Sequence, residues 1–264
     1  MRYHEVLETL RCSEGVCTAD IHPDWRQGRT VFGGLQVALA VRAMRSMVGT
    51  GQQLRSLQAT FVAPLSGGRI ELRPDVLRTG RTATHVHCNL LLEDGTVGCT
   101  IVAIFGASRP SSFVREIPRP EVHVAPEALE DMRYSQGTPP SFLQHMQVRW
   151  ALGTPPYTGY HDPRTVVYAR VREPECTPEE ALIALADVIP TPVLSMLREP
   201  APASSLNWTL ELLGDPDTFD VEGWSLIDTE VRAGIDGYLS QTSVLWGPSG
   251  HAFSVSHQTV AIFA

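Results

Sequence analysis

The two halves of the chain repeat one order of secondary structure, and this repeat limits the folds open to the chain. Residues 56–61 (SLQATF) and 205–210 (SLNWTL) alternate polar and apolar side chains in the same way, as a strand with one buried face does. Each of these strands follows a helical segment and precedes three further strand-like runs. Both halves close on Val-Ala-Ile-Phe, at residues 102–105 and 260–263. The sequence therefore predicts two copies of one unit.

Each predicted unit contains one helix and several strands. In the first half the pattern predicts a helix over about 33–47, apolar on most of its sides. In the second half, Thr177-Pro178-Glu179-Glu180 forms a capping box with proline at the first helical position, which predicts a helix over about 178–190. Strands are expected near 15–22, 54–63, 69–78, 82–92 and 97–106 in the first half, and near 164–173, 204–213, 223–232, 237–246 and 251–263 in the second.

A helix followed by antiparallel strands, used twice, is an α+β architecture. We expect an N-terminal unit at residues 1–107 and a C-terminal unit at residues 144–264. Between them, residues 108–143 are rich in proline, which is typical of a connector that crosses from one unit to the other.

Composition narrows the function classes. The net charge of −8 argues against a nucleic-acid partner, whose phosphates need a basic surface. No apolar run approaches the ~20 residues that span a bilayer, and the first residues lack the apolar core of a signal peptide, so we expect a cytoplasmic location. The five cysteines are scattered and predict reduced, mostly buried thiols with no zinc site. No cofactor or metal is expected, and the chain has no lysine for Schiff-base chemistry.

Asp187 is the residue that most directly indicates chemistry. It stands among apolar residues of the second predicted helix, where an aspartate is a poor helix former and is costly to bury unpaired. One interpretation places it on the single wet stripe of that helix. The other is a desolvated carboxylate whose pKa rises toward that of a useful general base.

Several short motifs together resemble the type II acyl-CoA thioesterases and their bacterial relatives. In the first half they are Trp25-x-x-Gly28, residues 30–34 (TVFGG) and residues 80–82 (GRT); in the second they are residues 185–187 (LAD), 203–207 (ASSLN), 236–238 (DGY) and 256–258 (SHQ). The resemblance covers about residues 20–107 and 175–263. It implies a double hotdog fold and hydrolysis of a fatty acyl-CoA by a water molecule.

The resemblance also implies roles for individual residues. The water is expected to be held by Asp187, by a hydroxyl at Ser205 or Ser204, and by Gln258. The family leads us to expect threonine at position 205 and an acidic residue at position 207, where this chain has Ser205 and Asn207. Ser205 and Asn207 are expected to share the polar face of their strand, opposite Trp208.

The thioester oxygen becomes negative as water attacks, so the reaction needs a hydrogen-bond donor. Gly33 and Gly34 open the first helix, where free N–H groups point outward, although both glycines could equally serve only to pack that helix. If the N–H of Gly34 or of its neighbour is this donor, Gly34→Val is expected to reduce activity and leave the fold largely intact.

Other constellations are weaker. His85 and His87 share a strand face, as surface residues or as part of a metal site, and Arg78, Arg81 and Arg109 could either bind CoA phosphates or form ordinary surface. We expect acyl-CoA as the partner and a homo-oligomeric state. Two alternatives remain at this point: a hotdog enoyl-CoA hydratase or dehydratase, for which His257 beside Gln258 is the candidate histidine, and an acyl-CoA binding protein without catalytic activity.

Overall fold

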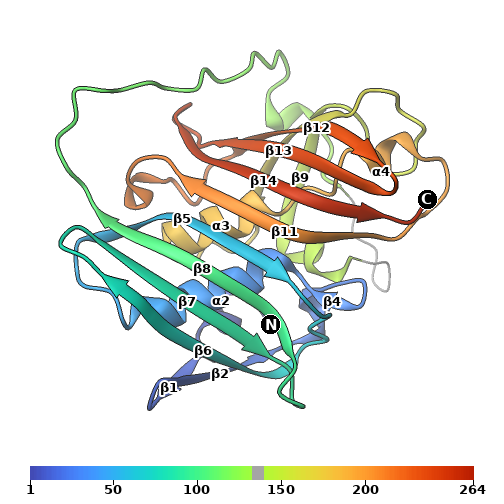
Figure 1. Cartoon of the computed structure of the whole chain (residues 1–264). Coiled ribbons are helices and arrows are strands. Elements are labelled where there is room, and N and C mark those ends of the chain that lie inside the picture. The colour runs from blue at the N-terminus through green and yellow to red at the C-terminus, as the bar shows by residue number, and fades with distance from the viewer. Residues whose placement is uncertain (133–139) are drawn as a thin grey trace.

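A twelve-stranded antiparallel sheet forms the body of the protein (Figure 1). The structure is a computed structural model that describes residues 1–132 and 140–264. In the first half of the sheet the strands are β1 (Arg11–Ser13), β2 (Val16–Ile21), β6 (Gly68–Thr79), β7 (Ala83–Leu91), β8 (Val97–Ala107) and β5 (Gln52–Phe61). The second half continues with β11 (Ala203–Leu212), β14 (Ala252–Ile262), β13 (Tyr238–Trp246), β12 (Ser225–Ile235), β10 (Arg164–Val171) and β9 (Met146–Leu152).

The two half-sheets join where β5 pairs with β11. Leu57 lies opposite Leu210 and Ala59 opposite Trp208, so the buried face continues across the junction. This pairing also covers the strand edge that each half would otherwise leave open. A separate two-stranded ribbon, β3 (Arg26–Gln27) and β4 (Thr30–Val31), precedes the first long helix.

Two helices, α2 (Gly33–Arg45) and α3 (Pro178–Ala186), lie beside each other on one face of the sheet (Figure 1). They are antiparallel, because Arg42 near the end of α2 pairs with Glu180 in the first turn of α3 at 2.8 Å, and Arg45 pairs with Glu179. These charges also suit the helix dipoles, since the cations lie at a C-terminus and the anions at an N-terminus. The beginning of α2 therefore lies at the end of α3.

The order of elements predicted from the sequence is present, and most predicted strands begin and end within three residues of the observed ones. The capping box of α3 is also present: Thr177 accepts a hydrogen bond from the N–H of Glu180, and Glu180 accepts one from the N–H of Thr177. The expected end of this helix at residue 190 is wrong, because α3 ends at Ala186. After Ala186 the N–H groups of Asp187 and Val188 donate to the carbonyls three residues back, of Ala184 and Leu185, and Pro190 has no N–H with which to continue the helix.

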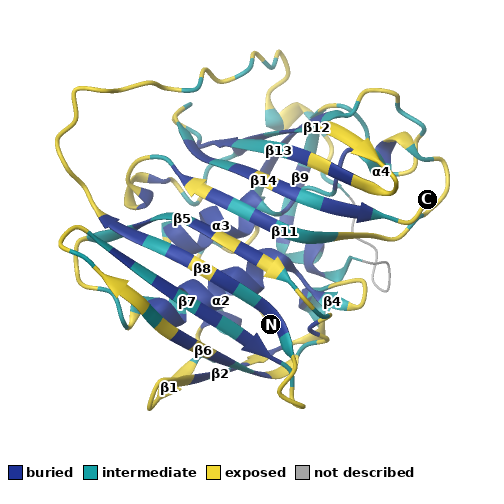
Figure 2. Ribbon diagram, viewed as in Figure 1, coloured by how far each residue is buried: buried dark blue, intermediate teal, exposed yellow. Residues whose placement is uncertain are grey.

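The connector lies against the face of the second half-sheet opposite to α3. The side-chain N–H of Trp246 donates to the carbonyl of Ile117 at 3.1 Å, and the hydroxyl of Tyr168 donates to that of Val124 at 3.2 Å. Together they close a second apolar cluster separate from the main core. Figure 2 shows how buried and less buried residues alternate along the strands of the sheet. Part of the predicted connector, residues 133–139, lies outside the described residues.

The expectation that all cysteines are reduced is wrong for two of them. Cys12 and Cys17 form a disulfide across the β1–β2 hairpin, where they are direct cross-strand partners. Glu14 and Gly15 between them both have positive φ values, 52° and 81°, as in the tight turns that bring hairpin strands together. The other three cysteines carry free thiols.

Some short elements were not predicted, namely α1 (Tyr3–Leu7), α4 (Val193–Met196), β1, β3, β4, β9 and four 3-10 turns, η1 (Pro23–Trp25), η2 (Pro126–Ala128), η3 (Ser141–His145) and η4 (Pro216–Thr218). They add edges and covers to the two predicted units without changing their order. Within the described residues, no helix combines the length and the apolar character that crossing a membrane requires.

Candidate active site

Asp187 stands at the C-terminal end of α3 as its capping residue. The prediction that Asp187 lies inside a helix is therefore wrong. The interpretation that placed it on a solvent-exposed stripe of that helix does not apply, because Asp187 follows the last helical residue. Because α2 and α3 are antiparallel, the end of α3 faces the first turn of α2, and the side chain of Asp187 reaches it. The carboxyl group is partly buried between the two helices and the sheet.

Two donors hold the carboxyl group of Asp187. The N–H of Gly34 donates to Oδ2 at 2.8 Å, and the side-chain amide of Gln258 donates through Nε2 to Oδ1 at 2.7 Å. Burial raises the pKa of Asp187 to about 7, and the hydrogen bonds from Gln258 and Gly34 lower it in part. A carboxyl group with this pKa is ionised in a large fraction of molecules near neutral pH and can still accept a proton.

The two glycines of α2 differ in what they face. A Cβ on Gly33 would lie 2.6 Å from Oδ2 of Asp187 and 3.0 Å from the ring of Phe61. A Cβ on Gly34 would lie 2.6 Å from the ring of Phe32 and 3.2 Å from the backbone of Ala184 in α3. Gly33 therefore leaves room for the carboxyl group, and Gly34 permits the close contact between the helices.

The expectation for Gly34→Val needs correction in this light. A valine at this position would press on the α2–α3 contact and on Phe32, whose ring stacks on Phe142 with centroids 4.1 Å apart. The substitution is therefore expected to affect folding as well as activity. In addition, the N–H of Gly34 already donates to Asp187, so of the donors expected from the sequence, Gly34 is not free and its neighbour remains.

Gln258 lies in β14 with two further polar partners. Its Oε1 accepts a hydrogen bond from Nε2 of Gln241 in β13 at 2.9 Å and one from the hydroxyl of Ser205 in β11 at 3.4 Å. Three neighbouring strands thus contribute to one network that ends on Asp187. The structure thus brings together all three residues that are expected to hold a water, Asp187, Gln258 and Ser205.

A β-bulge in β11 separates Ser205 from Asn207. Ser205 lies opposite Val260, whereas Asn207 lies opposite Thr259, and adjacent residues of β14 face opposite sides of the sheet. The expectation that Ser205 and Asn207 share one face is therefore wrong, because the extra residue shifts the alternation. Asn207 instead accepts a hydrogen bond from the N–H of Thr259 at 3.1 Å, which supports the bulge. Ser204 is exposed and lies opposite Ala261, away from Gln258.

The remaining sequence candidates lie apart from this network. Arg78, Arg81 and Arg109 are exposed. His87 contacts the hydroxyl of Thr100 at 2.8 Å. His257 is exposed, on the opposite face of β14 from Gln258, because neighbouring residues of a strand point to opposite sides.

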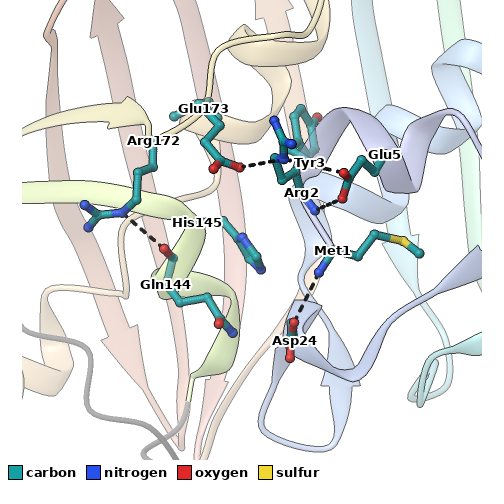
Figure 3. A pocket seen from close by; sticks show the side chains of 10 residues that line it. Met1, Arg2, Tyr3, Glu5, Asp24, Gln144, His145, Arg172 and Glu173 are labelled. Carbon is teal, nitrogen blue, oxygen red and sulfur yellow. Dashed lines mark hydrogen bonds and ion pairs between the residues drawn. The ribbon is translucent and has the colours of Figure 1, made fainter.

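A cavity of about 270 Å³ lies near the N-terminus and contains none of the predicted site residues (Figure 3). Its charged groups pair with one another: the Met1 amine with Asp24 at 3.3 Å, and Arg2 with Glu5 at 3.4 Å. His145 stacks on Trp25 there, and burial lowers its pKa to about 4. A second cavity, of about 320 Å³, borders the β5–β6 and β7–β8 loops. We place the candidate site at Asp187 because the predicted residues converge there.

Gln241 and Phe61 contact the site and were missed by the sequence reasoning. A signal for Gln241 existed, since it is a polar residue on the strand face that also carries the buried Leu239 and Leu245 of β13. Its partner could not be found in this way, because the register between β13 and β14 does not follow from alternation alone.

Two family models match the sequence. The acyl-CoA thioesterase N-terminal domain matches residues 21–106, and the acyl-CoA thioesterase C-terminal domain matches residues 126–262. No curated protein matches the chain in sequence.

Solved structures agree with the fold. A hotdog-fold protein of unknown function from Alicyclobacillus acidocaldarius superposes with a TM-score of 0.89 at 23% identity, covering 99% of this chain and 98% of its own. The acyl-CoA thioesterase II TesB2 of Mycobacterium marinum has a TM-score of 0.78 at 17% identity, with coverages of 99% and 98%. The tesB protein of Mycobacterium avium subspecies paratuberculosis gives 0.79 at 15%, with the same coverages. The double hotdog fold predicted from the sequence is confirmed.

Proposed function

Because this chain belongs to the acyl-CoA thioesterase family, we propose that it hydrolyses a fatty acyl-CoA, with Asp187 as the general base. The observation that carries the proposal is the setting of this one carboxyl group. It is held by a helix N-terminus and by a strand amide, at 2.8 and 2.7 Å, with a pKa raised to about 7. A base of this pKa is suited to activating water near neutral pH.

In the proposed reaction, Asp187 accepts a proton from a water molecule as the water oxygen adds to the thioester carbonyl. The tetrahedral intermediate then collapses, the carbon–sulfur bond breaks, and the leaving CoA thiolate takes up the proton held by Asp187, which restores the carboxylate. Ser205 and Gln258 lie in the network around Asp187 and position the water. Holding the reactants in place in this way is a large part of what a site contributes to the rate.

The proposed donor to the thioester oxygen is the N–H of Gly33. The N–H of Gly34 donates to Asp187, and those of Leu35 and Gln36 donate to the carbonyl of Phe32. Within the described residues, this leaves Gly33 as the first-turn residue of α2 whose N–H has no recorded acceptor. The dipole of α2 favours negative charge at the same place.

The enoyl-CoA hydratase alternative loses its sequence support. It depended on His257 beside Gln258, and His257 is on the opposite face of β14 from Gln258. The two hydrogen-bond partners of Asp187 in the described residues are Gly34 and Gln258, so no histidine is paired with this carboxyl group there.

A panel of acyl-CoAs tests the proposal. The protein is incubated with saturated short-, medium- and long-chain acyl-CoAs, and released CoA is measured with a thiol reagent. Matched samples with enoyl-CoA are followed by the loss of double-bond absorbance. We expect CoA release with at least one saturated substrate. Tight binding without CoA release would favour the binding-protein alternative, and double-bond loss without CoA release would favour a hydratase; either result contradicts the proposal.

A further inference from the structure

We propose that Gln241 is a positioning residue that holds the side-chain amide of Gln258 with its NH₂ group toward Asp187. The inference rests on the proposed function only in treating Asp187 as the base. Gln241 is 3% exposed and Gln258 is 9% exposed, so water competes little for their polar atoms. The two residues are direct partners across β13 and β14, and the rigid sheet sets the distance between them.

The direction of each hydrogen bond carries the argument. Nε2 of Gln241 donates to Oε1 of Gln258 at 2.9 Å, and Nε2 of Gln258 donates to Oδ1 of Asp187 at 2.7 Å. The two ends of an amide have nearly the same shape but opposite roles, one as acceptor and one as donor. While Gln241 donates to the oxygen end of Gln258, the orientation with the nitrogen end toward Asp187 is favoured over the flipped one.

The orientation of Gln258 matters because only its NH₂ end can donate to an ionised carboxylate. A flipped amide would bring Oε1 of Gln258 toward Oδ1 of Asp187, and two acceptors repel unless the carboxyl group carries a proton. The amide pair and the protonation of Asp187 are therefore linked. The present orientation favours the ionised form, which is the form a general base needs.

Among the described residues, the other groups that face Asp187 carry no charge, and one group, the hydroxyl of Ser205, shares the effect of Gln241 more weakly. From α2 Asp187 meets the N–H of Gly34, and from β14 the amide of Gln258. The ring of Phe61 of β5 borders the same space, since a Cβ on Gly33 would lie 3.0 Å from this ring and 2.6 Å from Oδ2 of Asp187. The charged residues of the two helices lie at the far end of the helix pair from Asp187. There Arg42 pairs with Glu180, and Arg45 pairs with Glu179. Ser205 is the second donor to Oε1 of Gln258, at the longer distance of 3.4 Å.

The variant Gln241→Met tests the inference, because methionine has a similar length and cannot donate. Its matched control is Thr229→Val, which removes the hydrogen bond between the hydroxyls of Thr229 and Ser243, 2.7 Å apart on the same face of the sheet, without touching Gln258. The pKa of Asp187 is measured directly by NMR with ¹³C-labelled aspartate, and its signal is identified by its absence from Asp187→Asn. Gln241→Leu serves as a second variant if Gln241→Met folds poorly.

We expect Gln241→Met to raise the pKa of Asp187 by roughly 0.5 to 1 unit, the equivalent of one hydrogen bond, and Thr229→Val to leave it unchanged. At neutral pH, kcat of Gln241→Met is expected to fall about twofold to fivefold, because the ionised fraction of Asp187 falls by that factor when its pKa rises from about 7. An unchanged pKa in a folded Gln241→Met, or an equal rise in Thr229→Val, would overturn the inference. The titration needs no substrate, so it remains decisive even if no acyl-CoA is hydrolysed and the proposed function fails.

Discussion

Asp187 is subject to opposing effects. Burial disfavours its charge, and so does its position at the C-terminus of α3, where the helix dipole is negative. The N–H of Gly34, at the positive end of α2, and the amide of Gln258 favour the charge. Burial is the larger effect, and the pKa of about 7 lies well above the ordinary value near 4. Ionising Asp187 in the folded protein therefore costs free energy. A role in function explains why the residue is present better than a role in stability does.

The same pKa predicts how stability depends on pH. Between pH 4 and pH 7 the folded protein holds the proton of Asp187 while the unfolded chain releases it, so this group lowers the free energy of unfolding as the pH rises. Asp187→Asn cannot ionise and escapes this loss. The stability of the variant relative to the wild type should therefore rise between pH 4 and pH 8, by ~1.4 kcal/mol for each unit of pKa shift.

Denaturant unfolding of both proteins at a series of pH values checks this prediction, and Thr229→Val controls for an unrelated buried change. A stability difference between wild type and Asp187→Asn that stays constant over this range would show that the pKa of Asp187 is ordinary.

The paired helices α2 and α3 create two unlike contacts, one at each end. At one end, Arg42 and Arg45 form ion pairs with Glu180 and Glu179, which fix how the helices lie together. At the other end, the glycines of α2 meet the carboxyl group of Asp187. Because the helices are antiparallel, each end of the pair joins the N-terminus of one helix to the C-terminus of the other. The end with the ion pairs is structural, and the other end forms the candidate site.

The two glycines of α2 should respond differently to the same substitution. Gly33→Ala puts a methyl group 2.6 Å from Oδ2 of Asp187, so we expect displacement of the carboxyl group and a loss of kcat of at least about tenfold, with a smaller effect on stability. Gly34→Ala crowds the backbone of Ala184 at 3.2 Å and should mainly destabilise the fold, by ~1–3 kcal/mol as overpacking does.

Steady-state kinetics and denaturant unfolding of both variants measure these effects. Gly49→Ala is the matched control, because a Cβ on Gly49 would meet nothing within 4 Å. Normal activity in a stably folded Gly33→Ala would show that the carboxyl group need not occupy this position.

At the scale of the whole molecule, the candidate site is shared between the halves. The first half supplies Gly33 and Gly34, and the second supplies Asp187, Ser205, Gln241 and Gln258. The joined sheet holds these parts in register, because Trp208 of β11 lies opposite both Ala59 of β5 and Gln258 of β14. Neither half contains the whole site.

Much of this arrangement could be predicted from the sequence, because its main signals are local. The alternation in residues 56–61 and 205–210 predicts strands, and the capping box at Thr177 predicts the start of α3. The resemblance to a known family identified Asp187, Ser205 and Gln258, which the structure brings together.

The predictions that were wrong or missing depend on contacts between residues that are distant in the sequence. The bulge that puts Ser205 and Asn207 on opposite faces, and the register that joins Gln241 to Gln258, both depend on which strands pair and where. Alternation within one strand contains neither fact. The disulfide between Cys12 and Cys17 was missed for a different reason: the Glu14-Gly15 turn was not recognised as a hairpin signal.

The central claim is that Asp187 is the base that activates water, and the pH dependence of kcat for wild type and Asp187→Asn tests it most directly. As a base, Asp187 must be ionised, so wild-type kcat should fall as the pH drops below about 7. Asp187→Asn should lower kcat by at least about a hundredfold at pH 8 while its melting temperature holds or rises, and its residual activity should lack this acid limb. A folded Asp187→Asn that hydrolyses acyl-CoA at the wild-type rate, with the same pH profile, would contradict the account.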